Sequence, residues 1–446
     1  MPTNLAKSQH DLAKETQNLD SKVDLEKIIL YTILLGVVAS FLVGSFLGEN
    51  SAGASRPDFF EYHWKAIQRF SEMSWDEAIT DYPSATNPLL YMAASLLPLH
   101  GSQKIYHVIT SVVGLLTWPL LSLAYYRRYA KHGIDLLWAS FGASAILISP
   151  CFRSSAFWGT TDYVPFLFCA ATSLLLSRVQ DLECEKARAI GMPTLVALAA
   201  VSACAFYTRQ SYAFLPVFAA WIVLTRTKTS PFLILSVFFV VMLPEMFLVY
   251  LWKGFNPPWF HGYFHPAMIN VLIVGAIVGF LSTPLVVGCI RRSVGDVLPE
   301  WWGSRSTVLA FAGLLVFIMA QRATEWPGPG AGGGIIVKAG LRMGALGTPF
   351  ILTVSYLGLV ATIVFAMRSA TNALLAGVLL APYLVSLVAY QHYLEPLLTV
   401  VLFLFADTRT ARTVFTKRVL TCNFGFTALI LAIGIVYYDY LVPPSG

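Results

Sequence analysis

Acidic, aromatic and histidine side chains gather in one polar stretch, residues 56–91, directly after the first long apolar segment. Asp58 and Glu61 are carboxylates that can take a proton from a reacting hydroxyl, and His63 follows two residues later. At a spacing of three residues, Asp58 and Glu61 would share one face of a helix. An ordinary amphipathic surface helix would show the same pattern, so this stretch needs support from the rest of the chain.

Four further polar patches lie near the ends of apolar segments that are far apart in the sequence. Their guanidinium, imidazole and carboxyl groups can bind a phosphate or move a proton. Each patch taken alone also has a structural explanation, such as a helix cap or an interfacial anchor. The four patches are Arg153 with the run 159–162 that ends at Asp162, Arg209 with Gln210, His261 with His265, and Gln391, His392, Tyr393 and Glu395.

The elements that position these patches are transmembrane helices. The chain has 446 residues, of which 57% are hydrophobic and 12% charged, against roughly 25% charged in a soluble domain. Apolar runs of about 20 residues can each cross a ~30 Å hydrocarbon core as a helix. We therefore expect an all-α polytopic membrane protein with about 13 spans, within a range of 12–14. The expected spans are 28–47, 104–126, 134–150, 160–177, 192–207, 211–226, 231–251, 267–290, 306–321, 347–367, 372–389, 393–407 and 419–440.

Basic residues set the expected orientation, because cytoplasmic loops of membrane proteins are enriched in Lys and Arg. With the N-terminus inside, 16 of the 30 Lys and Arg residues fall in inner loops. The short apolar segment 88–99 is then a partly inserted outer helix, with a true span as the alternative. This topology has a cytoplasmic tail (1–27), one transmembrane domain (28–446) and a first extracytoplasmic loop (48–103). All five polar patches fall on the outer side, which predicts a polar cavity that opens outward.

Several other functions are not indicated. The formal net charge of +6 comes from loops on one side of the membrane, so we expect no nucleic-acid partner. The six cysteines are isolated and form no CxxC pair, which argues against a zinc site or a disulfide framework. No metal or cofactor is expected. The glycine-rich run 325–334 lacks the Lys-Ser/Thr of a phosphate-binding loop and is predicted to be a flexible outer loop.

An extracytoplasmic site has no nucleotide pool, so its substrates would arrive through the membrane. A donor linked to a lipid phosphate fits, because its chain stays in the bilayer and its phosphate meets cationic side chains at the interface. Asp58 or Glu61 would then be the base for an acceptor hydroxyl.

These patches, in this order, resemble the GT-C superfamily of membrane glycosyltransferases, and within it the dolichyl-phosphate-glucose-dependent alpha-1,2-glucosyltransferases. The resemblance covers most of the chain as short islands. The sequence departs from the family pattern in four places: the acids are three residues apart instead of adjacent, Asn87-Pro88-Leu89 replaces Pro-Pro-Gly, Tyr212 replaces Asn, and His392 replaces Arg. The matching islands are Asp58 and Glu61, Tyr62-His63, Ala66, Trp75-Asp76 with Ile79-Thr80, Pro88 to Tyr91, Thr160 to Asp162, Arg209 to Ser211, Phe264 to Pro266, and His392-Tyr393 with Pro396.

The resemblance implies an inverting hexosyl transfer from a polyprenyl-phosphate donor (dolichyl or undecaprenyl) to a lipid-linked or extracytoplasmic glycan. The enzyme would lie among the lipids of a bacterial inner membrane or the endoplasmic reticulum, with its site on the extracytoplasmic or lumenal side. Trp75 and Trp259 would stack on sugar or anchor the protein at the interface. The implied residues are Asp58 and Glu61 as catalytic groups, Arg209, His265 and His392 as donor-phosphate ligands, and His63, Asp76, Tyr91, Asp162, Gln210 and Tyr393 as substrate ligands.

A transporter or flippase of lipid-linked saccharides is the alternative, because it would share the cavity and its basic contacts. It predicts acids within several spans. Here the acids concentrate outside the spans, with Glu245 as an exception, which favours the enzyme.

Overall fold

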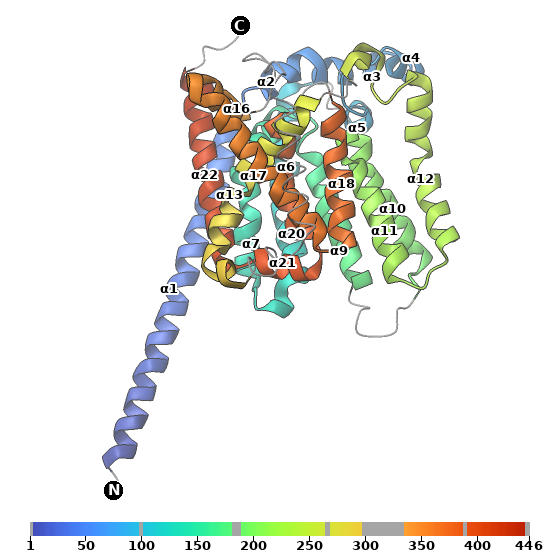
Figure 1. Cartoon of the computed structure of the whole chain (residues 1–446). Helices are drawn as coiled ribbons and strands as arrows, with labels where there is room; N and C mark the ends of the chain where they lie inside the picture. The colour runs from blue at the N-terminus through green and yellow to red at the C-terminus, as the bar shows by residue number, and fades with distance from the viewer. Residues whose placement is uncertain are drawn as a thin grey trace.

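The computed structural model describes residues 3–97, 101–180, 189–263, 268–296, 334–386 and 390–441, and the elements in these ranges are helices. The helices stand roughly side by side in one bundle (Figure 1). Helical structure follows from the apolar runs, because a backbone in lipid has to satisfy its own hydrogen bonds within the segment.

Within the described ranges, six helices are long and apolar enough to cross a membrane. They belong to α1 (Thr3–Leu47), α6 (Gln103–Tyr129), α12 (Pro231–Trp252), α13 (Met268–Asp296), α17 (Gly347–Met367) and α22 (Lys417–Ile435). A seventh crossing results if the bent pair Leu136–Ile148 and Pro150–Trp158, which meet at 66°, forms one span. The protein is therefore a helical membrane protein.

The remaining expected spans coincide with shorter helices, except 306–321, which lies outside the described residues. These helices are α9 (Val164–Gln180), α10 (Met192–Thr208), α11 (Phe214–Arg226), α18 (Ala370–Val385) and α20 (Leu397–Phe405). Several have apolar cores of 10–17 residues, which is short for a ~30 Å core. The number of 13 spans stays a prediction. Segment 88–99 contains only α5 (Leu89–Leu96), which is about 12 Å long at 1.5 Å per residue.

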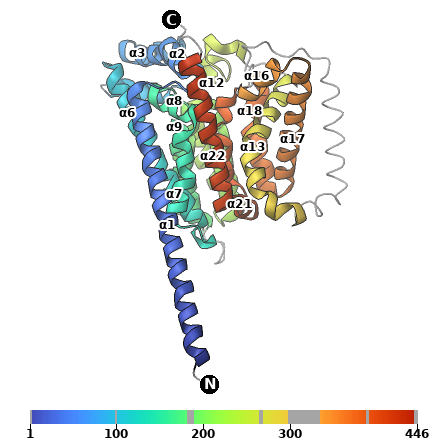
Figure 2. The ribbon, with the colours of Figure 1, turned by 90° about the vertical axis from the view of Figure 1, so that its left-hand side faces the viewer.

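The bundle has two distinct ends. Helices α2 (Ser55–Asp58), α3 (Trp64–Glu72) and α4 (Trp75–Thr80) lie across one end, while α1 begins beyond the other (Figures 1 and 2). The short α21 (Thr408–Val414) lies at the end where α1 leaves the bundle. There the Arg412 Nε donates to His132 Nε2 at 3.0 Å, and Lys417 pairs with Glu26 at 2.6 Å.

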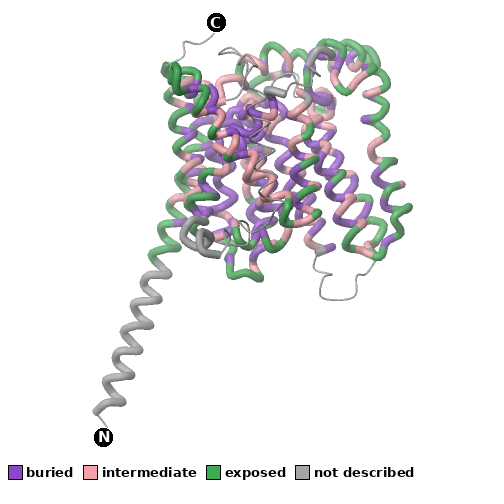
Figure 3. The backbone as a smooth tube through the Cα atoms, viewed as in Figure 1, coloured by how far each residue is buried: buried purple, intermediate pink, exposed green. Residues whose placement is uncertain are grey.

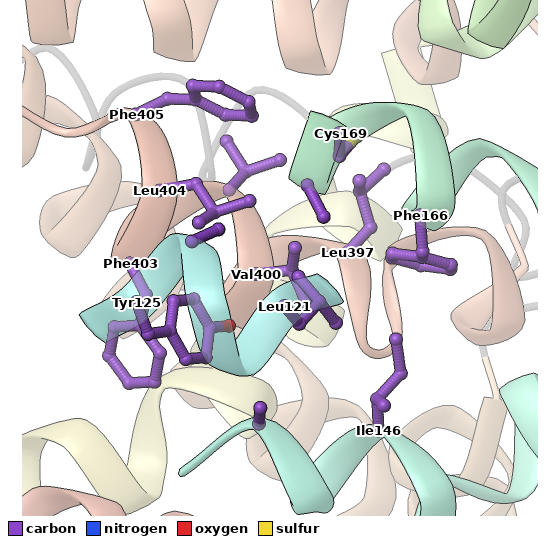
Figure 4. Packing of buried hydrophobic residues seen from close by; sticks show 14 of the residues in the cluster. Leu121, Tyr125, Ile146, Phe166, Cys169, Leu397, Val400, Phe403, Leu404 and Phe405 are labelled. Carbon is purple, nitrogen blue, oxygen red and sulfur yellow. The ribbon is translucent and has the colours of Figure 1, made fainter. Parts of the chain in front are cut away.

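Aromatic and aliphatic side chains fill the middle of the bundle, where the burial is greatest (Figure 3). The buried α20 packs against α6 and α9 (Figure 4). Phe403 meets Tyr125 edge to face at a ring distance of 5.8 Å. This core holds the frame to which the polar end of the molecule is attached.

Small residues bring α13 and α17 into close contact. A Cβ atom added at Gly358 would lie 1.9 Å from the carbonyl oxygen of Gly275 and 2.5 Å from the backbone nitrogen of Gly279. Gly275 and Gly279 form a small-xxx-small pattern, which lets transmembrane backbones approach closely. Because the two helices are close, the Ser355 hydroxyl of α17 can donate a hydrogen bond to the Leu272 carbonyl of α13 at 2.7 Å.

A buried ion pair fastens the end of α1 to α8 (Pro150–Trp158). The break before α8 follows from Pro150, whose missing N–H suits the first position of a new helix. The bend brings Arg153, which is 1% exposed, against Glu49. The Arg153 Nε donates to Glu49 at 3.0 Å, and its terminal nitrogens donate to the Ser40 hydroxyl at 3.2 Å and the Ser40 carbonyl at 3.0 Å. Arg153 is thus part of the frame.

We predict that Arg153→Met lowers the free energy of unfolding by about 3–5 kcal/mol, because it leaves the Glu49 carboxylate buried without its positively charged partner. Lys417→Met is the matched control, since it breaks an exposed pair worth at most about 1 kcal/mol. Thermal and denaturant unfolding of the detergent-solubilised protein measures both. Equal losses in the two variants would contradict the structural role of the buried pair.

Candidate functional site

A cavity of about 1020 Å³ opens within the end of the bundle that carries α2, α3 and α4. Its volume is at the upper end of the range for sites that hold small molecules. Residues from distant parts of the chain form its wall. The acidic, basic, histidine and amide side chains of the wall are Asp58, His63, Asp162, Arg209, Gln210, Glu245, Asn256, Lys338, Gln391, His392 and Glu395.

The cavity holds an ion pair between Arg209 and Asp162. Arg209 sits at a break between α10 and the 3₁₀ turn Gln210–Ala213, where its extended backbone (φ −157°, ψ 125°) ends one helix before the next begins. Its guanidinium also donates to the Thr161 hydroxyl at 3.3 Å and lies 4.6 Å from the centre of the Tyr393 ring. Three segments far apart in sequence therefore meet at one cation.

Asp58 is half-buried in the cavity wall, at the end of α2. The pKa of Asp58 is raised to about 7, mainly by burial and also by the negative charge of Asp162, whereas the charge of Arg209 opposes the rise. A carboxyl group with this pKa is present in both protonation states at neutral pH. It can therefore accept or donate a proton there, as a general base or acid requires.

Glu61 does not share this position. It is exposed and lies outside the cavity wall, so of the two expected catalytic carboxylates the structure brings Asp58, and not Glu61, to the cavity. The reason is local: residues Phe59–His63 form a π-helical turn, which is wider than an α-helical turn and moves Glu61 out of register with Asp58.

His63 and Tyr91 form a buried support next to Asp58. The Nδ1 atom of His63 is hydrogen-bonded to the Tyr91 hydroxyl, which also contacts the Thr86 hydroxyl at 2.9 Å and the Ser84 hydroxyl at 3.3 Å. Burial lowers the pKa of His63 to about 4, so its imidazole is neutral at pH 7. His63 faces the cavity, whereas Tyr91 is fully buried behind it.

Three more predicted site residues line the same cavity. Gln210 donates to the Ala85 carbonyl at 3.1 Å, which ties the 3₁₀ turn after Arg209 to the first loop. His392 and Tyr393 lie on the short helix α19 (Gln391–Leu394), with their rings 4.3 Å apart. The structure thus brings Asp58, His63, Asp162, Arg209, Gln210, His392 and Tyr393 into one wall.

Other predicted residues are placed elsewhere or not described. Asp76 is exposed on α4 and is not part of the cavity wall. Trp75 and Trp259 are 42% and 55% exposed and also lie outside the wall. His265 lies outside the described residues. Among those described, no group of three or more His, Cys, Asp or Glu side chains has the arrangement of a metal site.

The sequence analysis gave no chemical role to three charged residues of the cavity wall, although Glu395 was part of one polar patch. Glu245 lies in the middle of α12 and accepts two hydrogen bonds of 3.0 Å from the Asn87 amide. Glu395 is buried beside the Gln391 amide at 2.9 Å. Lys338 lies on α16 (Gly334–Arg342). The signal for Glu245 was its place within an apolar span, since an acid at that depth faces a partner or a cavity.

One side of the cavity is apolar. It is lined by Phe206 near the end of α10, by Phe214 and Val217 near the start of α11, and by Val378, Ala381 and Pro382 near the end of α18. Helices α11 and α18 pack against each other. Val217 is 48% exposed and Ala381 is also exposed, so this side of the cavity reaches the outer surface of the bundle. We call these six residues the apolar slot.

Comparisons with known proteins find no matching family model, curated protein or solved structure. The functional argument therefore depends on the residues of the cavity and their geometry.

We predict that the protonation of Asp58 depends on Asp162. A water-soluble carbodiimide modifies protonated carboxyl groups. As the pH is raised, the extent of Asp58 modification should therefore fall to half of its low-pH maximum near pH 7. Asp162→Asn should move this midpoint to lower pH, because it removes a negative charge and frees the positive charge of Arg209. Glu61→Gln is the control and should produce a smaller shift, since Glu61 makes the weaker contribution. Mass spectrometry of the Asp58 peptide measures the modification, and identical midpoints in all three proteins would contradict the coupling.

Proposed function

We propose that this protein is an inverting membrane glycosyltransferase that uses a polyprenyl-phosphate hexose as donor and a lipid-linked or extracytoplasmic glycan as acceptor. One observation carries the proposal: the half-buried Asp58, poised to exchange a proton near neutral pH, shares a cavity with the Arg209–Asp162 pair and the apolar slot. A proton acceptor, a cationic contact and an apolar entrance are what transfer from a lipid phosphate requires.

In the proposed reaction the acceptor hydroxyl oxygen attacks the anomeric carbon of the hexose. Asp58 takes the hydroxyl proton as the new C–O bond forms. The bond from the anomeric carbon to the phosphate oxygen breaks, and the lipid phosphate leaves with the electron pair. Attack opposite to the leaving group inverts the anomeric centre, and Arg209, His265 and His392 steady the departing phosphate.

The orientation of the site is also part of the proposal. The basic residues Arg128, Arg412 and Lys417 gather at the end of the bundle opposite the cavity. Because cytoplasmic ends of membrane proteins are enriched in Lys and Arg, we infer that the cavity faces the extracytoplasmic or lumenal side of a bacterial inner membrane or the endoplasmic reticulum.

Transfer itself is the decisive test. Purified protein is incubated with radiolabelled polyprenyl-phosphate glucose, mannose, galactose or arabinose and with membrane-lipid acceptors. Asp58→Asn should lower transfer by about 10²- to 10⁴-fold, the usual contribution of a general base, while leaving the unfolding temperature unchanged. Glu61→Gln is the control and should stay active.

Three other outcomes change the conclusion. An active Asp58→Asn with an inactive Glu61→Gln would move the role of base to Glu61. Full activity of both variants would contradict a mechanism in which Asp58 or Glu61 acts as the general base. Movement of labelled lipid across a vesicle membrane without any glycan product would favour the flippase.

We predict that the apolar slot admits the lipid chain. Ala381→Trp should narrow the slot and lower kcat/KM for a long-chain donor by about tenfold, comparable to the cost of overfilling a packed site. The same variant should leave a short-chain, water-soluble donor analogue unaffected. Ala373→Trp, exposed on the same helix but outside the cavity wall, is the control. Equal loss with both donors would contradict entry through the slot.

A further inference from the structure

The charges of the cavity wall are not evenly matched. Among the described wall residues, Arg209 and Lys338 are the cations. The charge of Arg209 is balanced by Asp162, with which it forms an ion pair. No ion pair in the described ranges involves Lys338. The wall also holds the carboxyl groups of Asp58, Glu245 and Glu395, but none of them forms an ion pair with Lys338. The Lys338 ammonium group can therefore contact an anionic ligand directly.

The backbone around Lys338 is held by α19. The Gln391 side chain accepts a hydrogen bond from the Ile335 backbone N–H at 2.8 Å and donates to the Glu395 carboxyl at 2.9 Å. This link fixes the first turn of α16. Ile335 and Lys338 are three residues apart on one helix face, and both line the cavity.

The side chain of Lys338 is held from the other side by the π-helical segment Val436–Leu441, which follows α22. Its Nζ atom lies 3.3 Å from the Tyr438 hydroxyl and 5.7 Å from the centre of the Tyr438 ring. The Tyr438 ring packs so closely on Gly53 that a Cβ atom there would lie 2.3 Å from a ring carbon. A tyrosine directs the ammonium group without neutralising it, which leaves two of its three N–H donors for a ligand.

Arg342 provides an internal comparison. It lies one helical turn beyond Lys338, and its guanidinium contacts Tyr437 in a similar way, at 3.3 Å from the hydroxyl and 5.6 Å from the ring centre. Arg342 is exposed and is not part of the cavity wall. The two cations share a helix and a type of partner, but only Lys338 reaches the cavity.

We propose that Lys338 binds the phosphate of a polyprenyl-phosphate lipid in this cavity, as a phosphate ligand additional to Arg209. The choice of ligand rests on the proposed function. The ammonium group is a compact charge with free donors, the kind of group that binds phosphate. The lipid chain of the same molecule would occupy the apolar slot.

The first experiment measures binding without any transfer step. Polyprenyl phosphate and the neutral polyprenol of equal chain length compete for the purified protein in nanodiscs. The wild type should prefer the phosphate, and Lys338→Met should reduce that preference about tenfold or more. Lys338→Arg should retain most of it, and Arg342→Met should match the wild type. A folded Lys338→Met with an unchanged preference would overturn the proposal.

A second experiment uses the wild-type protein and does not depend on a variant that folds. An amine-acylating reagent labels Lys338, and mass spectrometry quantifies the labelled Lys338 peptide. The neighbouring Arg342 does not react with this reagent. Polyprenyl phosphate should slow labelling of Lys338 several-fold, while polyprenol leaves it unchanged. Equal protection by polyprenol, or by inorganic phosphate at the same concentration, would overturn the role in lipid-phosphate binding.

The two proposals fail in different ways. Protection of Lys338 by polyprenyl phosphate, in a protein that transfers no sugar, would support the anion site and count against the glycosyltransferase. Sugar transfer by a Lys338→Met variant with unchanged donor KM would support the enzyme and overturn the role of Lys338.

Discussion

The ion pair between Arg209 and Asp162 is the interaction on which the candidate site depends. It joins the break after α10 to the turn before α9, and the Tyr393 ring of α19 covers the same guanidinium. The pair also sets the charge of the cavity. Because the two charges largely cancel, neither one dominates Asp58, whose pKa is then raised mainly by burial. The same cancellation leaves Lys338 as the described wall residue whose positive charge is not balanced by an ion pair.

The site combines a rigid frame with irregular backbone at its rim. The core around α20 and the Arg153–Glu49 pair hold the helices in place. Three side chains of the candidate site lie where helices are interrupted: Asp58 beside a π-helical turn, Arg209 in an extended break, and His392 on a helix of four residues. Breaks of this kind in a membrane protein are tolerated where the backbone lines a cavity. The arrangement therefore links the position of the functional groups to the position of the helix ends.

The sequence allowed us to predict the helical class and most apolar segments, because a run of about 20 apolar residues has few alternatives to a helix in lipid. It also predicted that Asp58, Asp162, Arg209 and His392 belong together. It missed the separation of Asp58 from Glu61, because a π-helical turn depends on tertiary packing and leaves no periodic signal. Lys338 was missed for another reason: it follows a glycine-rich run, and its approach to the cavity depends on the contact of α16 with α19.

The most direct test of this account is a structure of the protein with a bound non-transferable polyprenyl-phosphate sugar. The account predicts that the sugar lies beside the Asp58 carboxyl and the phosphate beside Arg209, with the isoprenoid chain passing between α11 and α18. A ligand bound elsewhere on the bundle, with Asp58 facing only solvent, would contradict it.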